Sequence, residues 1–299
     1  MRAEPTNDDK PLACESSSWL PAEASTRRYA RLTRLRHYPL ETAIAMVFPK
    51  GTPPTEVARI ERATRLLAAA GVPVPEIYDA RPDAGWILQE DLGDRTLAAS
   101  CEGSENVDAA YDEALAILSR IVALGDIETS PRPPLDGARM RQELELFATS
   151  ALVLDGPPGA ALDGDLSTLA EACAALPVTL CHRDYHARNL MLHEGRVRVV
   201  DHQDALVGPE PYDRVSLAYD PYVDLPDARR DELAGAAEGT AVVAVQRLAK
   251  AIGTYASKGG DWRSSIAPAA RQARRLMPQT GLRLPVLDVA LATLSMDAA

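Results

Sequence analysis

The chain has 299 residues, of which 46% are hydrophobic and 25% are charged, values typical of a folded globular protein. Its 32 Lys and Arg against 43 Asp and Glu give a formal net charge of −11, which argues against binding to a nucleic-acid phosphate backbone, because such binding needs a cationic surface. The four cysteines show neither C-x-x-C pairs nor zinc-type spacing, and no apolar run approaches the roughly 20 residues that span a bilayer, so we expect a cytoplasmic protein with reduced thiols and with no membrane or nucleic-acid partner.

The first hundred residues predict a small α+β domain behind a polar tail. Residues 1–18 carry few large apolar groups, and we expect them to be flexible. The runs "YARLTRL" and "ETAIAMVF" predict two short strands joined by a polar turn. The stretch "TEVARIERATRLLAAAG" predicts a helix capped by Thr55 and ended by Gly71, and "GWILQEDLGD" predicts a buried strand. We expect this domain to cover residues 19–92.

The remainder, residues 93–299, predicts a second and mostly helical domain. Pro-rich breaks such as "SPRPPLDG" separate its Ala- and Leu-rich segments. The exception is 178–201, where "VTLCH" and "RVRVVD" predict short strands around the polar stretch "HRDYHARN". The predicted helical segments are 107–124, 138–152, 164–175, 227–257 and 262–276.

The polar stretch carries the residue types of phosphoryl transfer. It contains Asp184 and Asn189, and the β-type run that follows a turn at Gly195 ends at Asp201. Carboxylate and amide oxygens are the ligands that Mg²⁺ prefers, and Mg²⁺ often bridges protein carboxylates to substrate phosphates. One aspartate must also face the acceptor hydroxyl and take its proton. The spacing predicts Asp184 as this base, and Asn189 and Asp201 as metal ligands.

Two other interpretations of the same residues are possible. A lone H-x-D would more simply be a hydrogen-bonded loop, but H-x-D-x-x-x-x-N followed by a hairpin and an aspartate favours a kinase-type catalytic loop. A zinc site at His182, His186 and His193 fits by residue type. We disfavour it, because no cysteines are interleaved and the helical H-E-x-x-H spacing is absent.

The block "HRDYHARNLM … VVDHQDALVGPEPYD", with "EASTRRYARL" and "EDLGDRTL" upstream, resembles the aminoglycoside phosphotransferase and choline kinase superfamily over about residues 19–225. Within it, the chain is most similar to bacterial anomeric kinases that phosphorylate N-acetylmuramate and N-acetylglucosamine at C1 in peptidoglycan recycling. The resemblance implies an α+β, protein-kinase-like bilobal fold. A small N-terminal β-rich lobe and a larger, mainly helical C-terminal lobe would hold ATP and Mg²⁺ between them.

The resemblance also implies roles for individual residues. Asp184 would be the catalytic aspartate, and Asn189 and Asp201 the magnesium ligands. The turn "EASTRRY" would cover the ATP phosphates with backbone N–H groups, and "QEDLG" would meet adenine with backbone groups. The residues implied are Ser25, Thr26 and Arg28 for the phosphates, Glu90 and Leu92 for adenine, and Arg183 and Asp204 for the sugar.

Two positions depart from the pattern of such kinases. Met46 stands where many kinases place a strand lysine, so the phosphate counter-charge would come from Arg28 or Lys50, with Glu56 or Glu61 orienting it. His202 follows Asp201 where the sugar kinases have an aromatic residue, and we interpret it as a packed core histidine. In the same block, a tyrosine replaces the basic residue expected before Asp220.

Three functions follow. The first is an ATP-dependent sugar 1-kinase acting on free N-acetylmuramate or N-acetylglucosamine. The second is a kinase of another small acceptor, since a polycationic aminoglycoside would suit an acidic protein. The third is a nucleotide-binding pseudokinase scaffold, which the missing strand lysine favours and the intact Asp184, Asn189 and Asp201 disfavour. The sequence leaves the acceptor, the choice of ATP or GTP and the oligomeric state open.

Overall fold

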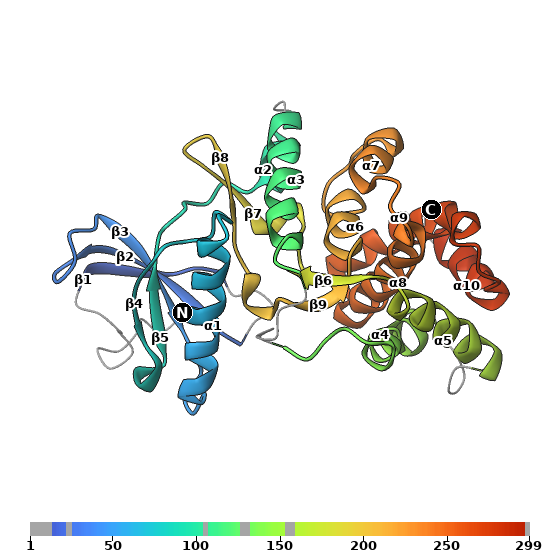
Figure 1. Ribbon diagram of the computed structural model, residues 1–299, viewed down its shortest axis with the longest axis horizontal. Coiled ribbons are helices and arrows are strands. Elements are labelled where there is room, and N and C mark those ends of the chain that lie inside the picture. The colour runs from blue at the N-terminus through green and yellow to red at the C-terminus, as the bar shows by residue number, and fades with distance from the viewer. Residues whose placement is uncertain (1–13, 22–25, 104–106, 126–131, 153–158, 297–299) are drawn as a thin grey trace. The chain divides into compact units, whose positions relative to one another are not determined.

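The structure is a computed structural model that describes residues 14–21, 26–103, 107–125, 132–152 and 159–296. It divides into two compact units, drawn in Figure 1. The first is Met1–Arg95 together with Met191–Gln203, and the second is Thr96–Leu190 together with Asp204–Ala299. The predicted domain boundary between residues 92 and 93 stays a prediction.

The first unit is built on a five-stranded antiparallel sheet with the strand order β1-β2-β3-β5-β4. Helix α1 packs against β4 and β5. A separate hairpin, β7-β8, supplies the later residues of this unit. The elements are β1 (Cys14–Trp19), β2 (Arg28–Leu35), β3 (Thr42–Val47), α1 (Pro54–Ala69), β4 (Ile77–Arg81), β5 (Trp86–Gln89), β7 (Leu190–His193) and β8 (Arg196–Val199).

Successive side chains of the central strands point to opposite faces of the sheet, and both faces are apolar. One face carries a cluster that includes Leu32 and Leu88, and the other packs Met46 and Ile87 against Val57 and Ile60 of α1. The two strands and the helix predicted from the sequence are confirmed. The predicted Thr55 cap is wrong: the helix begins one residue earlier, at Pro54, because proline fits the first turn of a helix, where no partner for its missing N–H is needed.

Both edge strands were missed by the sequence prediction. Residues 14–18, expected in the flexible tail, form most of β1 and pair in register with β2 from Cys14↔Leu35 to Trp19↔Ala30. Strand β4 occupies the other edge. An edge strand needs a partner for its backbone but not two apolar faces, so a polar sequence such as "CESSSW" gives little periodic signal.

The second unit is mostly helical, and a short antiparallel pair, β6-β9, lies within it. The predicted helix 138–152 is α4 followed by a single π-helical turn (Phe147–Ala151). The predicted helix 227–257 divides into α7 and α8, because Gly235 and Gly239 take positive φ angles that helical residues do not adopt. The elements are α2 (Leu97–Glu102), α3 (Asp108–Val122), α4 (Gly137–Glu143), α5 (Ala160–Ala174), β6 (Val178–Cys181), β9 (Leu206–Pro209), α6 (Tyr212–Ala218), α7 (Asp227–Ala234), α8 (Thr240–Lys258), α9 (Ile266–Leu276) and α10 (Pro285–Met296).

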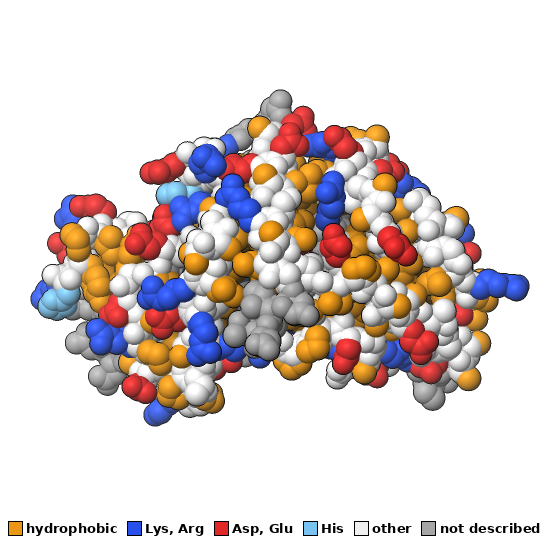
Figure 2. Space-filling view, in the orientation of Figure 1, with side chains coloured by type: hydrophobic (Ala, Val, Ile, Leu, Met, Phe, Trp, Pro, Cys, Tyr) orange, Lys and Arg blue, Asp and Glu red, His pale blue; other side chains and the backbone are white. Residues whose placement is uncertain are grey.

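The surface carries both signs of charge. On the face in Figure 2, acidic and basic side chains are interspersed, and no broad area of the described residues there is covered by Lys and Arg alone. Within the described ranges, no helix is both long enough and apolar enough to cross a membrane.

Candidate active site

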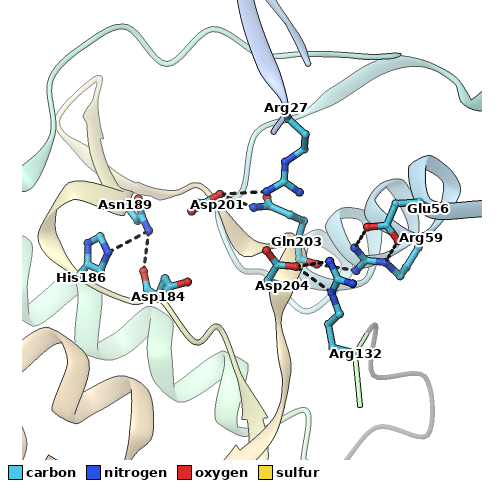
Figure 3. Close-up of polar contacts among 10 residues, drawn as sticks. All are labelled: Arg27, Glu56, Arg59, Arg132, Asp184, His186, Asn189, Asp201, Gln203 and Asp204. Atoms are coloured by element: carbon cyan, nitrogen blue, oxygen red, sulfur yellow. Dashed lines mark hydrogen bonds and ion pairs between the residues drawn. The ribbon is translucent and has the colours of Figure 1, made fainter. Parts of the chain in front are cut away.

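The catalytic loop predicted from the sequence follows β6 in the helical unit. Asn189 ends a 3-10 turn (Ala187–Asn189) and is buried. Its Nδ2 donates to the Asp184 backbone carbonyl at 2.9 Å, as Figure 3 shows. Because the amide nitrogen is used in this way, the side-chain oxygen Oδ1 is directed away from that carbonyl. The loop therefore presents an amide oxygen from Asn189 and a carboxylate from Asp184.

Two buried aspartates hold this loop by its backbone. Asp213 accepts hydrogen bonds from the N–H groups of His182 and Arg183, the latter at 2.8 Å. Asp220 accepts from the Ala187 N–H at 2.7 Å and from the Tyr222 N–H at 2.8 Å. Burial raises the pKa of Asp220 to about 6, although the two N–H donors oppose the shift. These roles were missed, since no local pattern separates a loop-holding aspartate from a solvated one.

Positive charges surround Asp184. Burial alone would raise the pKa of its carboxyl, but the charges of Lys250, Arg247 and Arg183 outweigh burial and lower it. Asp184 is therefore ionised at neutral pH and able to accept a proton. Burial lowers the pKa of His186 to about 4, so that imidazole is neutral under the same conditions.

The two residues assigned to the sugar by resemblance each lie in an ion pair. The Arg183 guanidinium contacts Glu143 at 2.7 Å, and Lys250 approaches the same carboxylate at 3.3 Å. Asp204 accepts from Arg132 at 2.7 Å and 2.9 Å (Figure 3). Any contact of Arg183 or Asp204 with an acceptor would have to compete with these pairs, and their roles stay predictions.

Asp201 belongs to the first unit, where it follows the β7-β8 hairpin. Glu194 and Gly195 both have positive φ, as a two-residue type I′ turn requires. Asp201 itself has φ +62°, a left-handed conformation that is uncommon for a residue other than glycine. Its carboxylate accepts from Gln203 Nε2, and Arg27 Nη2 lies 4.0 Å away (Figure 3). Strain of this kind persists where the surrounding contacts impose it, which is common at functional sites.

Neighbouring arginines of the predicted phosphate-covering turn point in different directions. The Arg28 guanidinium lies 3.8 Å from the centroid of the Trp19 ring, whereas Arg27 approaches Asp201. The cation beside the predicted metal ligand is thus Arg27, one residue before the one assigned by resemblance. Thr26 precedes it in a bend, and Ser25 lies outside the described residues.

The position of the usual strand lysine is apolar. Met46 packs in the cluster that faces α1, so no cation reaches that helix from this strand position. Glu56 instead pairs with Arg59 of its own helix at 2.6 Å, and Arg59 also donates to the Gln203 carbonyl at 2.7 Å. Glu61 pairs with Arg65 in the same way, at 2.9 Å.

The predicted adenine hinge has two of its backbone groups in use. The Glu90 N–H donates to the Glu76 carbonyl at 2.9 Å, and the Leu92 carbonyl lies 3.2 Å from His193 Nδ1. The Glu90 side chain forms an ion pair with Arg198 of β8. The Glu90 carbonyl and the Leu92 N–H are therefore the groups we expect to meet adenine.

His202 is buried and lies 2.7 Å from Thr64 Oγ1 of α1 through Nε2. This contact agrees with a packing histidine rather than a proton donor. We expect His202→Phe to lower the free energy of unfolding by about 1–3 kcal/mol, because a buried polar contact is lost. The pH profile of kcat should keep its shape. Loss of a limb near neutral pH together with a large fall in rate would show instead that the imidazole takes part in catalysis.

The two side chains predicted to hold magnesium carry atoms of the right kind. Asn189 has an amide oxygen and Asp201 a carboxylate, and Mg²⁺ is usually held by one or two carboxylates, with waters and substrate phosphates completing its coordination. In the described part of the chain, no three His, Cys, Asp or Glu side chains gather as a metal cluster would require, which disfavours the zinc interpretation.

Comparison with known proteins agrees with these features. The profile of the phosphotransferase enzyme family matches residues 19–248. Two relatives named N-acetylmuramate/N-acetylglucosamine kinase are similar in sequence. The one from Pseudomonas putida is 32% identical over 70% of this chain and 60% of its own length, and the one from Pseudomonas aeruginosa is 34% identical over 62% and 56%. The matched part of this chain thus spans less than two thirds of either relative.

Solved structures show the fold. A choline/ethanolamine kinase family protein from Mesorhizobium loti has a TM-score of 0.59 at 15% identity, over 93% of this chain and 92% of its own. A choline kinase from Streptococcus pneumoniae has a TM-score of 0.59 at 13% identity, over 93% of each chain. The predicted kinase-like α+β fold, with a β-rich unit and a mainly helical one, is confirmed.

Proposed function

Because the chain belongs to the phosphotransferase enzyme family, we propose that it is an ATP-dependent kinase that phosphorylates the C1 hydroxyl of N-acetylmuramate and N-acetylglucosamine. The observation that carries the catalytic part is Asp184, an ionised carboxylate on a loop fixed by Asp213 and Asp220. The sugar part rests on the names of the relatives. We place the reaction in the cytoplasm, as a step of peptidoglycan recycling.

The proposed step is a direct transfer. The acceptor oxygen attacks the γ-phosphorus of ATP, the bond from that phosphorus to the bridging oxygen breaks, and ADP leaves. The acceptor proton passes to the Asp184 carboxylate, and most of this transfer can come late in a loose transition state. Asn189 and Asp201 would hold Mg²⁺, which neutralises charge on the phosphates. Arg27 would add positive charge in place of the strand lysine that Met46 replaces.

A C1 hydroxyl suits a carboxylate base. The ring oxygen withdraws electron density from C1, so a hemiacetal hydroxyl ionises more readily than other sugar hydroxyls. Asp184 has a lowered pKa and is a weak base, and it therefore needs an acceptor whose proton is lost easily. This chemical match favours the anomeric position over C6.

The test compares each free sugar with its 1-O-methyl glycoside, which keeps every other hydroxyl. We expect ATP consumption with N-acetylglucosamine and N-acetylmuramate and none above background with the glycosides. Phosphorus NMR should show the product phosphate coupled to the C1 proton. Turnover of the glycosides, or coupling to the C6 protons, would rule out C1. Turnover of aminoglycosides alone would favour the second function, and ATP binding with no acceptor at all would favour a pseudokinase.

A further inference from the structure

One cation of the catalytic loop, a second cation and an aromatic cluster next to them are not used by the proposed step. The guanidinium carbon of Arg188, the residue before Asn189, is 3.8 Å from the Tyr222 ring centroid and 5.6 Å from that of Trp262. The Lys258 ammonium is 4.3 Å from the same Trp262 centroid. Both cations approach the same indole ring, and they therefore lie close to one another.

The chain builds this cluster at the end of α8. Lys258 is its last residue, and Gly259 and Gly260 follow with φ of +66° and +56°. Two consecutive left-handed residues reverse the chain, which glycine allows at little cost. The 3-10 segment after them places Trp262 against Tyr255 of the helix, with nearly parallel rings whose centroids are 5.8 Å apart.

The cluster touches the catalytic loop directly. The His186 ring meets the Tyr222 ring edge to face at 5.3 Å, and His186 Nε2 lies 3.5 Å from Asn189 Nδ2. The same Asn189 amide holds the Asp184 carbonyl. A molecule bound by Arg188 would therefore contact the catalytic loop itself, next to Asn189.

Neither cation has a carboxylate partner in the described part of the chain. Arg188 and Lys258 are exposed, and among the described residues no carboxylate lies within 4.0 Å of either, although the chain has an excess of acidic groups. Asp220 feels the charge of Arg188, but it is fully buried and already accepts two backbone hydrogen bonds. Two other cations near this loop, Arg183 and Lys250, are paired with Glu143. Arg188 and Lys258 together therefore offer a site for an anion.

We infer that Arg188 and Lys258 bind the carboxylate of the acceptor sugar, with Tyr222 and Trp262 holding the two cations in position. The inference rests on the proposed function and specifies its substrate class as an N-acetyl amino sugar that carries an acid group. N-acetylmuramate differs from N-acetylglucosamine by a lactyl ether with a carboxylate. An arginine fork matches a carboxylate in geometry, and the lysine ammonium adds a second positive charge. The chain should therefore prefer N-acetylmuramate.

The test measures kcat/KM for both sugars in the parent chain, Arg188→Met and Lys258→Met. Loss of one charge-assisted contact should lower the ratio of the two kcat/KM values, N-acetylmuramate over N-acetylglucosamine, by about ten- to a hundredfold in each variant. Methionine keeps the apolar stem of either side chain. Arg263→Met is the matched control, since Arg263 is exposed on the same 3-10 segment and lies outside the cluster. That control should leave the ratio unchanged.

A second measurement separates this inference from the proposed function. Trp262 lies in the site, so its fluorescence should change when N-acetylmuramate binds in the absence of ATP. The dissociation constant from this titration should be lower for N-acetylmuramate than for N-acetylglucosamine. If the acid sugar binds with this preference but neither sugar is phosphorylated, the proposed function fails and the site stands. If both sugars are phosphorylated and Arg188→Met and Lys258→Met keep the parent ratio, the inference is wrong and the function stands.

Discussion

Asp184→Asn should lower kcat by about 10²- to 10⁴-fold while ATP still binds with nearly parental affinity. The amide has the shape of the carboxylate but cannot take the acceptor proton. The Asp184 backbone carbonyl, which accepts from Asn189 Nδ2, is unchanged by the substitution, so the predicted amide ligand stays in place. Single-turnover kinetics measures the chemical step, and calorimetry with a non-hydrolysable ATP analogue measures binding.

Two observations would show that a fall in rate is specific. Glu210→Gln removes one exposed carboxylate from the same unit and should leave kcat unchanged. In the parent enzyme, kcat should show no acid limb from Asp184 near neutral pH. A base works only when ionised, so its limb appears as pH falls through its pKa, and surrounding cations hold the pKa of Asp184 below its usual range. Near-parental turnover of Asp184→Asn would remove Asp184 from the mechanism.

The sequence predicted those parts of the fold in which the spacing of apolar residues along the chain matches the face that is buried. Helix α1 buries Val57, Ile60 and Leu67 on one stripe, so its pattern was visible. The edge strand β1 is held by backbone pairing with β2, which depends on a partner and leaves no periodic trace in its own residues. The break between α7 and α8 was not predicted, because the Ala-rich residues on either side continue a helical pattern across the glycines.

The site shows the same division between local and distant signals. The spacing within "HRDYHARN" and the hairpin after it identified Asp184, Asn189 and Asp201 as candidates. Sequence could not separate Arg27 from Arg28, because strand register decides which side chain faces Asp201, and a shift of one residue exchanges the two faces. Asp213 was equally hidden, since the N–H groups that it binds lie about thirty residues earlier in the chain.

Asp201→Asn should weaken the binding of Mg²⁺-ATP by at least about tenfold and change the binding of metal-free ATP much less. The substitution isolates the charge. Asparagine tolerates the left-handed backbone that Asp201 adopts at φ +62°, and its amide oxygen can still accept from Gln203 Nε2. What is lost is a negative oxygen ligand, together with its attraction for Arg27 4.0 Å away.

The measurement is calorimetric titration with ATP, once with saturating Mg²⁺ and once with a chelator. If Asp201 is a metal ligand, Mg²⁺ should raise the affinity of the parent chain for ATP, and Asp201→Asn should lose most of that increase. Glu61→Gln removes a carboxylate from an exposed pair with Arg65 in the same unit and should keep the gain. Asp184→Asn should keep it as well, because Asp184 is assigned to the acceptor proton. If Asp184→Asn and Asp201→Asn lose the Mg²⁺-dependent gain equally, the division of labour between base and metal ligand is wrong.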